Sequence, residues 1–339
     1  MSLNFEYITD TINWEQNIKL FNEANFLQSW NWGVFQESMG KIVTRLSVRR
    51  EKSLVAMAQL VRETAKRGTY VTIAGGPLLN WDDEELVLQT FEEIKKIAKE
   101  QGAIFIRFRP QALNSQKLRN TVKKFGAVAS QMHLTADLTL QLDLSNSEDD
   151  ILQQMRKNTR YSIRKSEKDG ITTVFSKDKN DIKQFCDFQN DLAKRHGFVP
   201  FSYEFLFNQF SSFLDDDQVI LIHSYKDEIL LASAFIIFYN GEAVYHYGIS
   251  TPENGKLPGS YACQWAAIKE AKKRGITKYN FWGIAPEEEK NHRFAGVSIF
   301  KRGFGGEEVQ YLPSHDMPLS AKYNLTSSFE FLRKKMRKL

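Results

Sequence analysis

One lysine in the last fifth of the chain has the surroundings expected of a functional cation. Lys301 lies in the run FKRGFGG, with Phe300 and Phe304 on either side and several glycines around it. A fixed positive charge acts more strongly on a developing negative charge where water is excluded. The sequence therefore favours Lys301 as a catalytic cation. The alternative is a solvated lysine at the edge of a strand.

Two tyrosines upstream of Lys301 form a second candidate group. Tyr245 and Tyr247 belong to an apolar, aromatic run, Ala243 to Ile249, whose composition is typical of a strand. Alternate residues of a strand point to the same face, so we expect both rings on one side of the sheet. There they would line a substrate site, or else serve as ordinary core or surface aromatics.

The elements that must position these residues follow one another closely. After the strand at 243–249, a Pro-Gly-Ser turn at 258–260 opens a predicted helix over 261–274, and a short strand follows at 279–284. This order is the core of an N-acyltransferase-type fold. The first backbone N–H groups of such a helix lack intrahelical partners and can bind an anion.

The rest of the chain shows a similar order of elements in each half, without a repeat of letters. Each half is expected to contain a strand hairpin, further strands and amphipathic helices, which predicts an α/β (α+β) fold with two domains of ordinary size. The expected strands are 42–48, 54–61, 70–73, 103–108, 138–144, 171–175, 219–225 and 230–239, and the expected helices are 28–39, 81–101, 117–125, 151–166, 179–194, 203–214 and 327–339.

Composition limits the classes of function. The 339 residues are 42% hydrophobic and 26% charged, which favours a packed globular protein. The net charge of +5 permits a polyanionic partner without requiring one. The two cysteines, Cys186 and Cys263, have no ligand spacing, so no metal site is expected. The N-terminal residues do not resemble a signal peptide and no stretch predicts a membrane span, so we expect a cytoplasmic protein.

Several segments, in order along the chain, carry a family resemblance. They are Gln28-Ser29 with Trp32, Gly75-Gly76-Pro77, residues 134–171 with the sequence RYSIRK, residues 193–198, residues 245–284 and the run FKRGFG at 300–305. In these segments the chain resembles the Fem family of aminoacyl-tRNA-dependent transferases, which add amino acids to the peptidoglycan stem peptide. It looks like the short form, because it has no heptad stretch long enough for a coiled-coil arm.

The resemblance implies two tandem GNAT-like N-acyltransferase domains with mixed central sheets. The first would comprise residues 1–145 with 317–339, and the second residues 146–316. The implied reaction is aminolysis in interpeptide bridge formation: the stem-peptide amine of UDP-MurNAc-pentapeptide or lipid II attacks the ester of an aminoacyl-tRNA. An activated ester needs alignment and oxyanion stabilisation rather than a metal or other cofactor. Lys301 matches the lysine of the family's FK motif, whose implied role is to stabilise that negative charge.

The resemblance also suggests substrate-binding residues. Phe300, Phe304, Tyr245 and Tyr247 would line the acyl or acceptor site, and Arg195 and Tyr203 flank a loop that would contact the acceptor. An arginine suits phosphate through its forked donors, although Arg195 also fits a cation at a helix C-terminus. The chain has Gln36 where short members carry a lysine that helps to bind the sugar-nucleotide phosphates, and a neutral amide does not supply that charge.

Two basic segments suggest contact with tRNA. Arg156, Arg160 and Arg164 are spaced i, i+4, i+8 in the predicted helix over 151–166, which places them on one face. They would bind phosphates of the tRNA, or form a solvated face. The basic residues near the C-terminus allow the same role, or a peripheral contact with an anionic membrane. These are Lys334, Lys335, Arg337 and Lys338.

Two other functions stay open on the sequence alone. The chain could be an acyl-coenzyme A-dependent N-acyltransferase that holds the pyrophosphate at the turn 258–260. It could also be a non-catalytic module that binds RNA or the cell envelope. The sequence does not indicate which amino acid is transferred.

Overall fold

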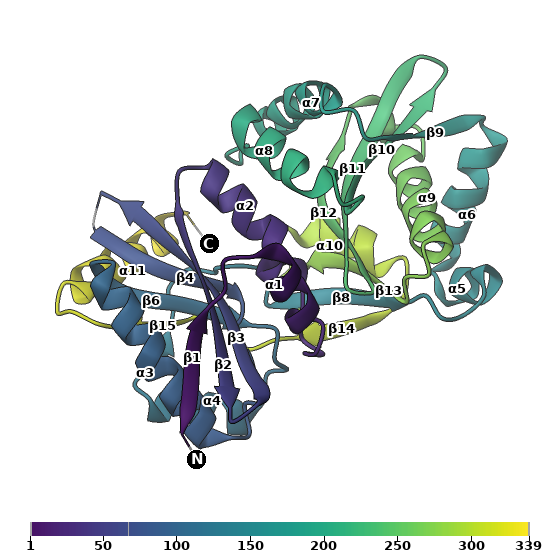
Figure 1. The fold of residues 1–339 in the computed structure, drawn as a ribbon. Coiled ribbons are helices and arrows are strands. Elements are labelled where there is room, and N and C mark those ends of the chain that lie inside the picture. The colour runs from purple at the N-terminus through teal and green to yellow at the C-terminus, as the bar shows by residue number, and fades with distance from the viewer. Residues whose placement is uncertain (1, 67, 338–339) are drawn as a thin grey trace. The chain divides into compact units, whose positions relative to one another are not determined.

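Each half of the chain builds its own mixed sheet in the computed structural model, which describes residues 2–66 and 68–337 (Figure 1). The first unit comprises the chain up to Asp137 together with the segment from Gln310 onward, and the second unit runs from Leu138 to Val309. The predicted α/β fold with two mixed sheets is confirmed.

The sheet of the first unit has the strand order β1-β2-β3-β4-β6-β15-β7, with β5 paired to β3. Its one parallel pair among the described strands is β4 with β6, which stay in register as far as Gly75 and Pro110. The strands are β1 (Leu3–Tyr7), β2 (Ile42–Arg50), β3 (Ser53–Ala65), β4 (Gly68–Gly75), β5 (Leu78–Leu79), β6 (Ala103–Pro110), β7 (Val128–Ala129) and β15 (His315–Pro318).

The sheet of the second unit has the order β14-β8-β13-β12-β11-β10-β9. The pair β12 and β13 is parallel, whereas β8 runs antiparallel to β13. The strands are β8 (Leu138–Asp143), β9 (Ile171–Ser176), β10 (Val219–Lys226), β11 (Ile229–Tyr239), β12 (Glu242–Ser250), β13 (Lys278–Gly283) and β14 (Glu307–Gln310).

Several helices begin where the sequence supplies a polar cap. The side chains of Asp10, Ser29, Asp83, Ser115 and Ser202 each accept a hydrogen bond from a backbone N–H in the first turn, as helix N-termini favour. The first unit contains α1 (Thr11–Ile18), η1 (Phe26–Gln28), α2 (Trp30–Ser38), α3 (Glu84–Glu100), α4 (Gln116–Lys124) and α11 (Tyr323–Arg337). The second contains α5 (Glu148–Gln154), α6 (Lys157–Lys168), α7 (Asp181–His196), α8 (Tyr203–Leu214), η2 (Glu253–Gly255), α9 (Gly259–Lys273) and α10 (Ala295–Arg302).

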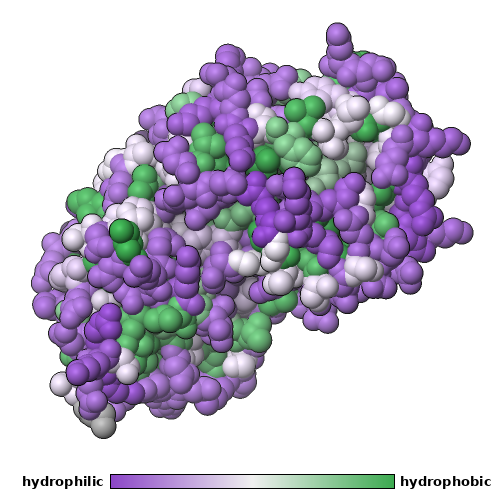
Figure 2. All heavy atoms as spheres, turned by 45° about the vertical axis from the view of Figure 1, so that its right-hand side comes forward, coloured by the Kyte–Doolittle hydropathy of each residue, from purple (hydrophilic) through white to green (hydrophobic). Residues whose placement is uncertain are grey.

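Each unit has its own apolar core. In the first, Phe91 stacks on Phe125 with ring centroids 4.5 Å apart and packs on Phe108 of β6. In the second, α9 and α6 lie on one face of the sheet, and α7 and α8 lie on the other (Figure 1). The face shown in Figure 2 is mostly hydrophilic and carries several separate hydrophobic areas. None of the helices that the structure describes is long and apolar enough to cross a membrane.

The predicted single helix over 151–166 is wrong. Met155 and Arg156 adopt extended backbone angles, with ψ of 152° and 147°, and separate α5 from α6. The guanidinium of Arg160 donates to the carbonyl oxygens of Gln153 and Met155 at the end of α5. It thereby satisfies backbone acceptors that a continuous helix would have paired internally. Arg156 stands at the break and not in the same helix as Arg160.

The domain limits also differ from the expected 1–145 plus 317–339 and 146–316. Strand β8 pairs with β13, so residues 138–145 belong to the second unit. Residues 310–316 belong to the first unit, because Tyr311 N donates to Asp137 O and β15 pairs with β6. The sequence shows the strand at 138–144 but does not show which sheet it joins.

The chain end does return to the first unit, and a buried ion network fastens it there. Arg107 of β6 binds Asp316 of β15 at 2.7 Å and Glu330 of α11 at 2.7 Å. Tyr323 Oη donates to the same Asp316 at 3.0 Å. Helix α11 begins four residues before the expected start at Ser327, and Lys338 and Leu339 of the expected helix lie outside the described residues.

Candidate functional site

The parallel strands of the second unit separate soon after they pair, and this opening sets the candidate site. Strand β12 pairs with β13 from Glu242 to Val244 only, opposite Lys278 to Asn280. Beyond that point β13 continues beside β8 as far as Gly283, which pairs with Thr139. In the first unit the equivalent parallel strands remain paired to their ends. In the second sheet, unlike the first, the backbone groups of β13 beyond Asn280 are not paired with the parallel strand and can bind a side chain from another element.

Lys301 fills this opening from helix α10. Its ammonium donates to Gly283 O at 2.7 Å, past the last residue of β13 that pairs with β12. The same Nζ lies 5.7 Å from the ring centroid of Tyr245 on β12, and Lys301 is 7% exposed. Residues 295–302 form a helix, so the alternative of a solvated lysine at the edge of a strand is wrong. Burial on a helix holds the ammonium in one place, as a solvated strand edge would not.

Burial also changes the proton affinity of Lys301. Desolvation penalises the charged form and lowers the pKa of the ammonium from 10.5 to about 7. A lysine with such a pKa is about half protonated at neutral pH and can both keep and release its proton there. It can therefore supply a positive charge to a developing oxyanion and a proton to a leaving oxygen.

Tyr245 and Tyr247 point to opposite faces of the sheet, and the prediction of a shared face is wrong. Tyr247 pairs with Phe235 of β11, but Tyr245 pairs with the next residue, Ile236, so His246 forms a bulge. A bulge adds one residue to a strand and reverses the alternation beyond it. Tyr245 therefore faces Lys301, and Tyr247 contacts Phe235 and Phe201 beneath α7 and α8.

The two phenylalanines beside Lys301 differ in role. Phe304 is fully buried and packs on Phe281, Tyr261 and Phe300, so it belongs to the core. This corrects the expectation that Phe304 contacts substrate, because it has no exposed surface to offer. Phe300 is half-buried and stands edge-on to Tyr261 at 5.1 Å. Phe300 can therefore present one side of its ring to a ligand.

A pocket of about 480 Å³ lies at the same end of the second unit. It is bounded by the start of α6, the start of α9 and the length of α10. Its lining residues are Arg156, Lys157, Asn158, Thr159, Tyr261, Gly296, Ile299, Phe300 and Gly303. Arg156 N donates to Gly303 O at 2.9 Å, and a Cβ on Gly303 would meet Thr159 Oγ1 at 2.5 Å, so only glycine allows this close approach. The pocket thus offers exposed cations beside two aromatic rings.

The three arginines predicted to bind tRNA lie in different environments. Arg156 is exposed and lines the pocket, whereas Arg160 is partly buried and caps α5. Arg164 is exposed on α6 and does not line the pocket. The three arginines therefore do not share one face: Arg156 lies at the pocket, Arg160 binds the backbone of α5, and Arg164 is a surface charge.

Arg195 and Tyr203 lie at the ends of α7 and α8, on the face of the sheet that Tyr247 shares. Arg195 is exposed and donates to Ser250 O at 2.5 Å. Tyr203 is the first residue of α8 and is 45% exposed. These three residues form a second group, separated by the sheet from Lys301, Tyr245 and Phe300.

Gln36 belongs to the first unit and is buried on α2. Its side-chain oxygen accepts a hydrogen bond from Lys41 Nζ at 2.9 Å. Lys41 also pairs with Glu63 at 2.8 Å and is partly exposed. A cation therefore stands next to the neutral amide. Lys41 was not singled out from the sequence, although it is separated from Gln36 by only four residues.

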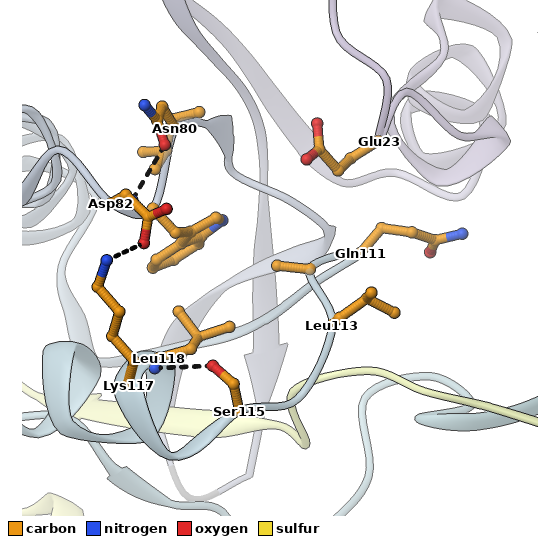
Figure 3. A pocket seen from close by; sticks show the side chains of 11 residues that line it. Glu23, Asn80, Asp82, Gln111, Leu113, Ser115, Lys117 and Leu118 are labelled. Carbon is orange, nitrogen blue, oxygen red and sulfur yellow. Dashed lines mark hydrogen bonds and ion pairs between the residues drawn. The ribbon is translucent and has the colours of Figure 1, made fainter.

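The first unit has a pocket of its own, of about 340 Å³, beside Trp81 (Figure 3). Glu23 and Gln111 border it, and Asp82 and Lys117 are paired at 2.6 Å at one side. Lys117 is thus neutralised, and Glu23 adds a carboxylate. Among the described lining residues no unpaired cation remains, so the pocket does not suit a phosphate group.

The two thiols offer no nucleophile. Cys263 is buried in α9 and its Sγ donates to the carbonyl oxygens of Ile222 and Ala232. Burial raises the pKa of this thiol to about 12, so it stays protonated at neutral pH. Burial likewise raises the pKa of Cys186. Neither thiol is therefore a candidate nucleophile for this site.

Sequence reasoning missed Lys157 and Tyr261 at the pocket and Gly283 at the opening. Lys157 follows Arg156 directly in the basic run that the sequence displays, so its signal was present. The sequence predicts Tyr261 at the start of a helix, but no local pattern indicates that its ring lines a pocket. The acceptor role of Gly283 O depends on the strand separation, which no local pattern reveals.

Comparison with known proteins places these features in a family. The model of the FemAB family matches residues 13–222 and 216–330. The aminoacyltransferase FemA of Staphylococcus epidermidis is 22% identical over 344 residues, covering 76% of this chain and 82% of FemA. A crystal structure of FemX superposes with a TM-score of 0.85 at 18% identity, covering 96% of this chain and all of FemX. A tandem GNAT protein from the clavulanic acid biosynthesis pathway gives a TM-score of 0.59 at 10% identity, over 94% and 98% of the two chains.

Proposed function

The chain belongs to the FemAB family and is an aminoacyltransferase, and we propose that it transfers an amino acid from aminoacyl-tRNA to the stem-peptide amine of a peptidoglycan precursor. This reaction would form part of an interpeptide bridge. The observation that carries the proposal is the buried ammonium of Lys301 at the opening between β12 and β13. The family supplies the reaction class, and this ammonium supplies the charge that the reaction needs.

The proposed chemistry is aminolysis of an ester. The acceptor amine attacks the ester carbonyl and forms a tetrahedral intermediate with a negative oxygen. That intermediate then releases the ribose oxygen of the tRNA; the attacking nitrogen gives up one proton, the ribose oxygen takes one up, and an amide bond remains. An ammonium has three N–H donors, and Gly283 O accepts one of them. The others would stabilise the negative oxygen, where a pre-positioned charge lowers the barrier most.

We assign the end of the tRNA to the pocket of the second unit. The exposed side chains of Arg156 and Lys157 would contact phosphates, and the rings of Tyr261 and Phe300 would stack on bases of the single-stranded end. Phe300 of the pocket directly precedes Lys301 in α10, and the proposal requires the ester of a nucleotide held here to extend from the pocket to the ammonium. We therefore propose Arg156 as a tRNA-binding residue, but not Arg160, whose guanidinium binds the backbone at the end of α5.

For the acceptor we propose contacts from Arg195, Tyr203 and Tyr247. Arg195 carries forked donors suited to a phosphate or carboxylate, and Tyr203 offers a partly exposed ring at the start of α8. The acceptor would be UDP-MurNAc-pentapeptide or lipid II, since both carry a diphosphate and a stem peptide.

The coenzyme A alternative is disfavoured by the start of α9. A pyrophosphate held there would need the first backbone N–H groups of the helix. Gly259 N already donates to Leu257 O at 2.9 Å, and Ser260 N donates to Asn254 Oδ1 at 2.8 Å. The turn at 258–260 therefore has its donors engaged within the protein.

The test is a transfer assay with defined partners. The protein is incubated with tRNA pools charged with single amino acids and with each of the two precursors, and the mass of the stem peptide is measured. We expect a mass increase of one amino acid residue for a particular tRNA and precursor. A mass change that requires an acyl-coenzyme A instead of charged tRNA would refute the proposal. A thermal-shift titration with coenzyme A gives an independent check.

A further inference from the structure

Helix α11 carries an apolar stripe on its exposed side. Leu325, Phe329, Leu332 and Met336 follow the spacing i, i+4, i+7, i+11, which aligns side chains along one side of a helix. Their exposed fractions are 76%, 42%, 57% and 76%. Apolar side chains of this size are normally covered when they gather on one face.

The other side of α11 is already packed. Tyr323, Thr326 and Glu330 are buried against the first sheet, at the spacing i, i+3, i+7. Glu330 binds Arg107 of β6, and Tyr323 donates to Asp316 of β15. These contacts set the rotation of the helix about its axis. Because these buried residues occupy one side of α11, the apolar stripe faces away from the sheet on which the helix packs.

The charges around the stripe have one sign. From Lys322 to Lys338 the sequence contains six basic residues and a single acidic residue, Glu330. Glu330 points inward and is neutralised by Arg107. Among the basic residues whose side chains the structure describes, Lys322 is exposed and Arg333 and Lys334 are partly exposed, so positive charge accompanies the exposed apolar groups. Such a pairing of an apolar stripe with flanking Lys and Arg is the pattern of a helix that lies in a membrane interface.

We propose that α11 binds the surface of an anionic lipid bilayer. The stripe enters the boundary between head groups and acyl chains, and the basic residues contact the anionic head groups. An RNA partner would use the cations but would leave Leu325, Leu332 and Met336 in water. A second copy of the chain would bring two sets of like charges together. The lipid surface is the partner that satisfies both features.

This contact deepens the proposed function by favouring a lipid-linked acceptor, but its test needs no substrate. The full chain is sedimented with vesicles of phosphatidylcholine, with and without phosphatidylglycerol. The stripe variant is Leu325→Gln/Leu332→Gln/Met336→Gln. Its matched control is Ile12→Gln/Leu20→Gln, which removes exposed apolar groups of the first unit at 70% and 72% exposure.

We expect the unmodified chain to bind the anionic vesicles and to bind less as salt increases. The stripe variant should bind at least about tenfold more weakly, because each apolar side chain that is removed reduces the area buried in the bound state. The control should bind as the unmodified chain does. Arg333→Gln/Lys334→Gln should weaken binding to anionic vesicles, whereas Lys19→Gln/Lys123→Gln elsewhere on the surface should not.

A second readout follows the depth of the helix. Both native cysteines are buried, so Met336→Cys provides a selective site for an environment-sensitive fluorophore. Its emission should shift to the blue on anionic vesicles. Equal binding by the stripe variant and its control would overturn the proposal, as would equal affinity for neutral vesicles. Sedimentation of a dimer without vesicles, abolished by the stripe variant, would also overturn it and assign the stripe to self-association.

Discussion

Burial of a lysine ammonium beside a carbonyl oxygen costs desolvation free energy, and such a cost is typical of a functional site. The ammonium of Lys301 loses most of its hydration, and within the described residues it gains a hydrogen bond to Gly283 O. The opening between β12 and β13 positions that carbonyl, and Tyr245 covers one side. At the residue scale, the site therefore depends on one charge that is held in place and partly desolvated.

The first prediction concerns the charge of Lys301. Lys301→Ala should reduce transfer by at least about a hundredfold, since loss of one oxyanion donor typically costs that much. The measurement is the initial rate of stem-peptide modification under matched substrate concentrations. Thermal unfolding of the variant should show that the fold persists. A rate near that of the unmodified protein would contradict the assignment.

The second prediction concerns pH. Because the pKa of Lys301 is lowered to about 7, the fraction of charged lysine falls as pH rises through that value. If the ammonium is the active form, kcat/KM should contain a limb that falls above about pH 7. The acceptor amine contributes a rising limb, since it attacks only when neutral. Lys301→Met should lose the falling limb and keep the rising one, and a variant that retains both limbs would rule out Lys301 as their source.

At the scale of elements, two local irregularities decide what the site contains. The break between α5 and α6 turns Arg156 toward the pocket and assigns Arg160 to the backbone of α5. The bulge at His246 turns Tyr245 toward Lys301 and Tyr247 toward the other face. Neither irregularity changes the order of the elements, but each changes which side chains meet.

The third prediction separates the two arginines. Arg156→Gln should weaken tRNA binding. It should also reduce the magnitude of the slope of log affinity against log salt concentration by about one, because the variant neutralises one phosphate fewer. Arg160→Gln should leave that slope unchanged and lower the free energy of unfolding by about 1–3 kcal/mol, because carbonyl groups at the end of α5 lose a charged donor. Filter binding over a salt series and chemical denaturation measure the two effects. A lower salt slope for Arg160→Gln, with the slope of Arg156→Gln unchanged, would contradict the assignment and indicate that Arg160 contacts the tRNA.

These irregularities also show how far the sequence could be interpreted. Periodicity located most helices and strands, and the aromatic and glycine neighbours of Lys301 indicated an enclosed cation. The bulge stayed hidden because it is defined by the register of the partner strand β11 and not by residues 243–249 alone. Helix α10 was missed because its eight residues are short for a periodic pattern. Burial of Phe304 required knowledge of Tyr261 and Phe281, which are distant in sequence.

At the scale of the whole molecule, the chain crosses twice between its units. The first unit is interrupted after Asp137 and resumes at Gln310, where β15 inserts between β6 and β7. The position of β8 in the second sheet shows why the expected limit at residue 145 was too late. A strand pattern identifies a strand, but its sheet is chosen by pairing with residues far along the chain.

The fourth prediction tests how the returning segment is held. Asp316→Asn leaves Arg107 without its bidentate partner in a buried place, and it should lower the free energy of unfolding by about 3–5 kcal/mol. Asp82→Asn removes an exposed pair with Lys117 and should cost about 1 kcal/mol or less. Urea denaturation of both variants makes the comparison. Equal losses would mean that the buried network contributes no more than a surface pair.

The interruption of the first unit by the second has a consequence for synthesis on the ribosome. Strands β1 to β6 emerge early, but β15 lies between β6 and β7 in the finished sheet and emerges only after the entire second unit. The second unit can therefore fold while the first still has an unpaired edge along β6. The part of the protein that is translated first is the part that is completed last.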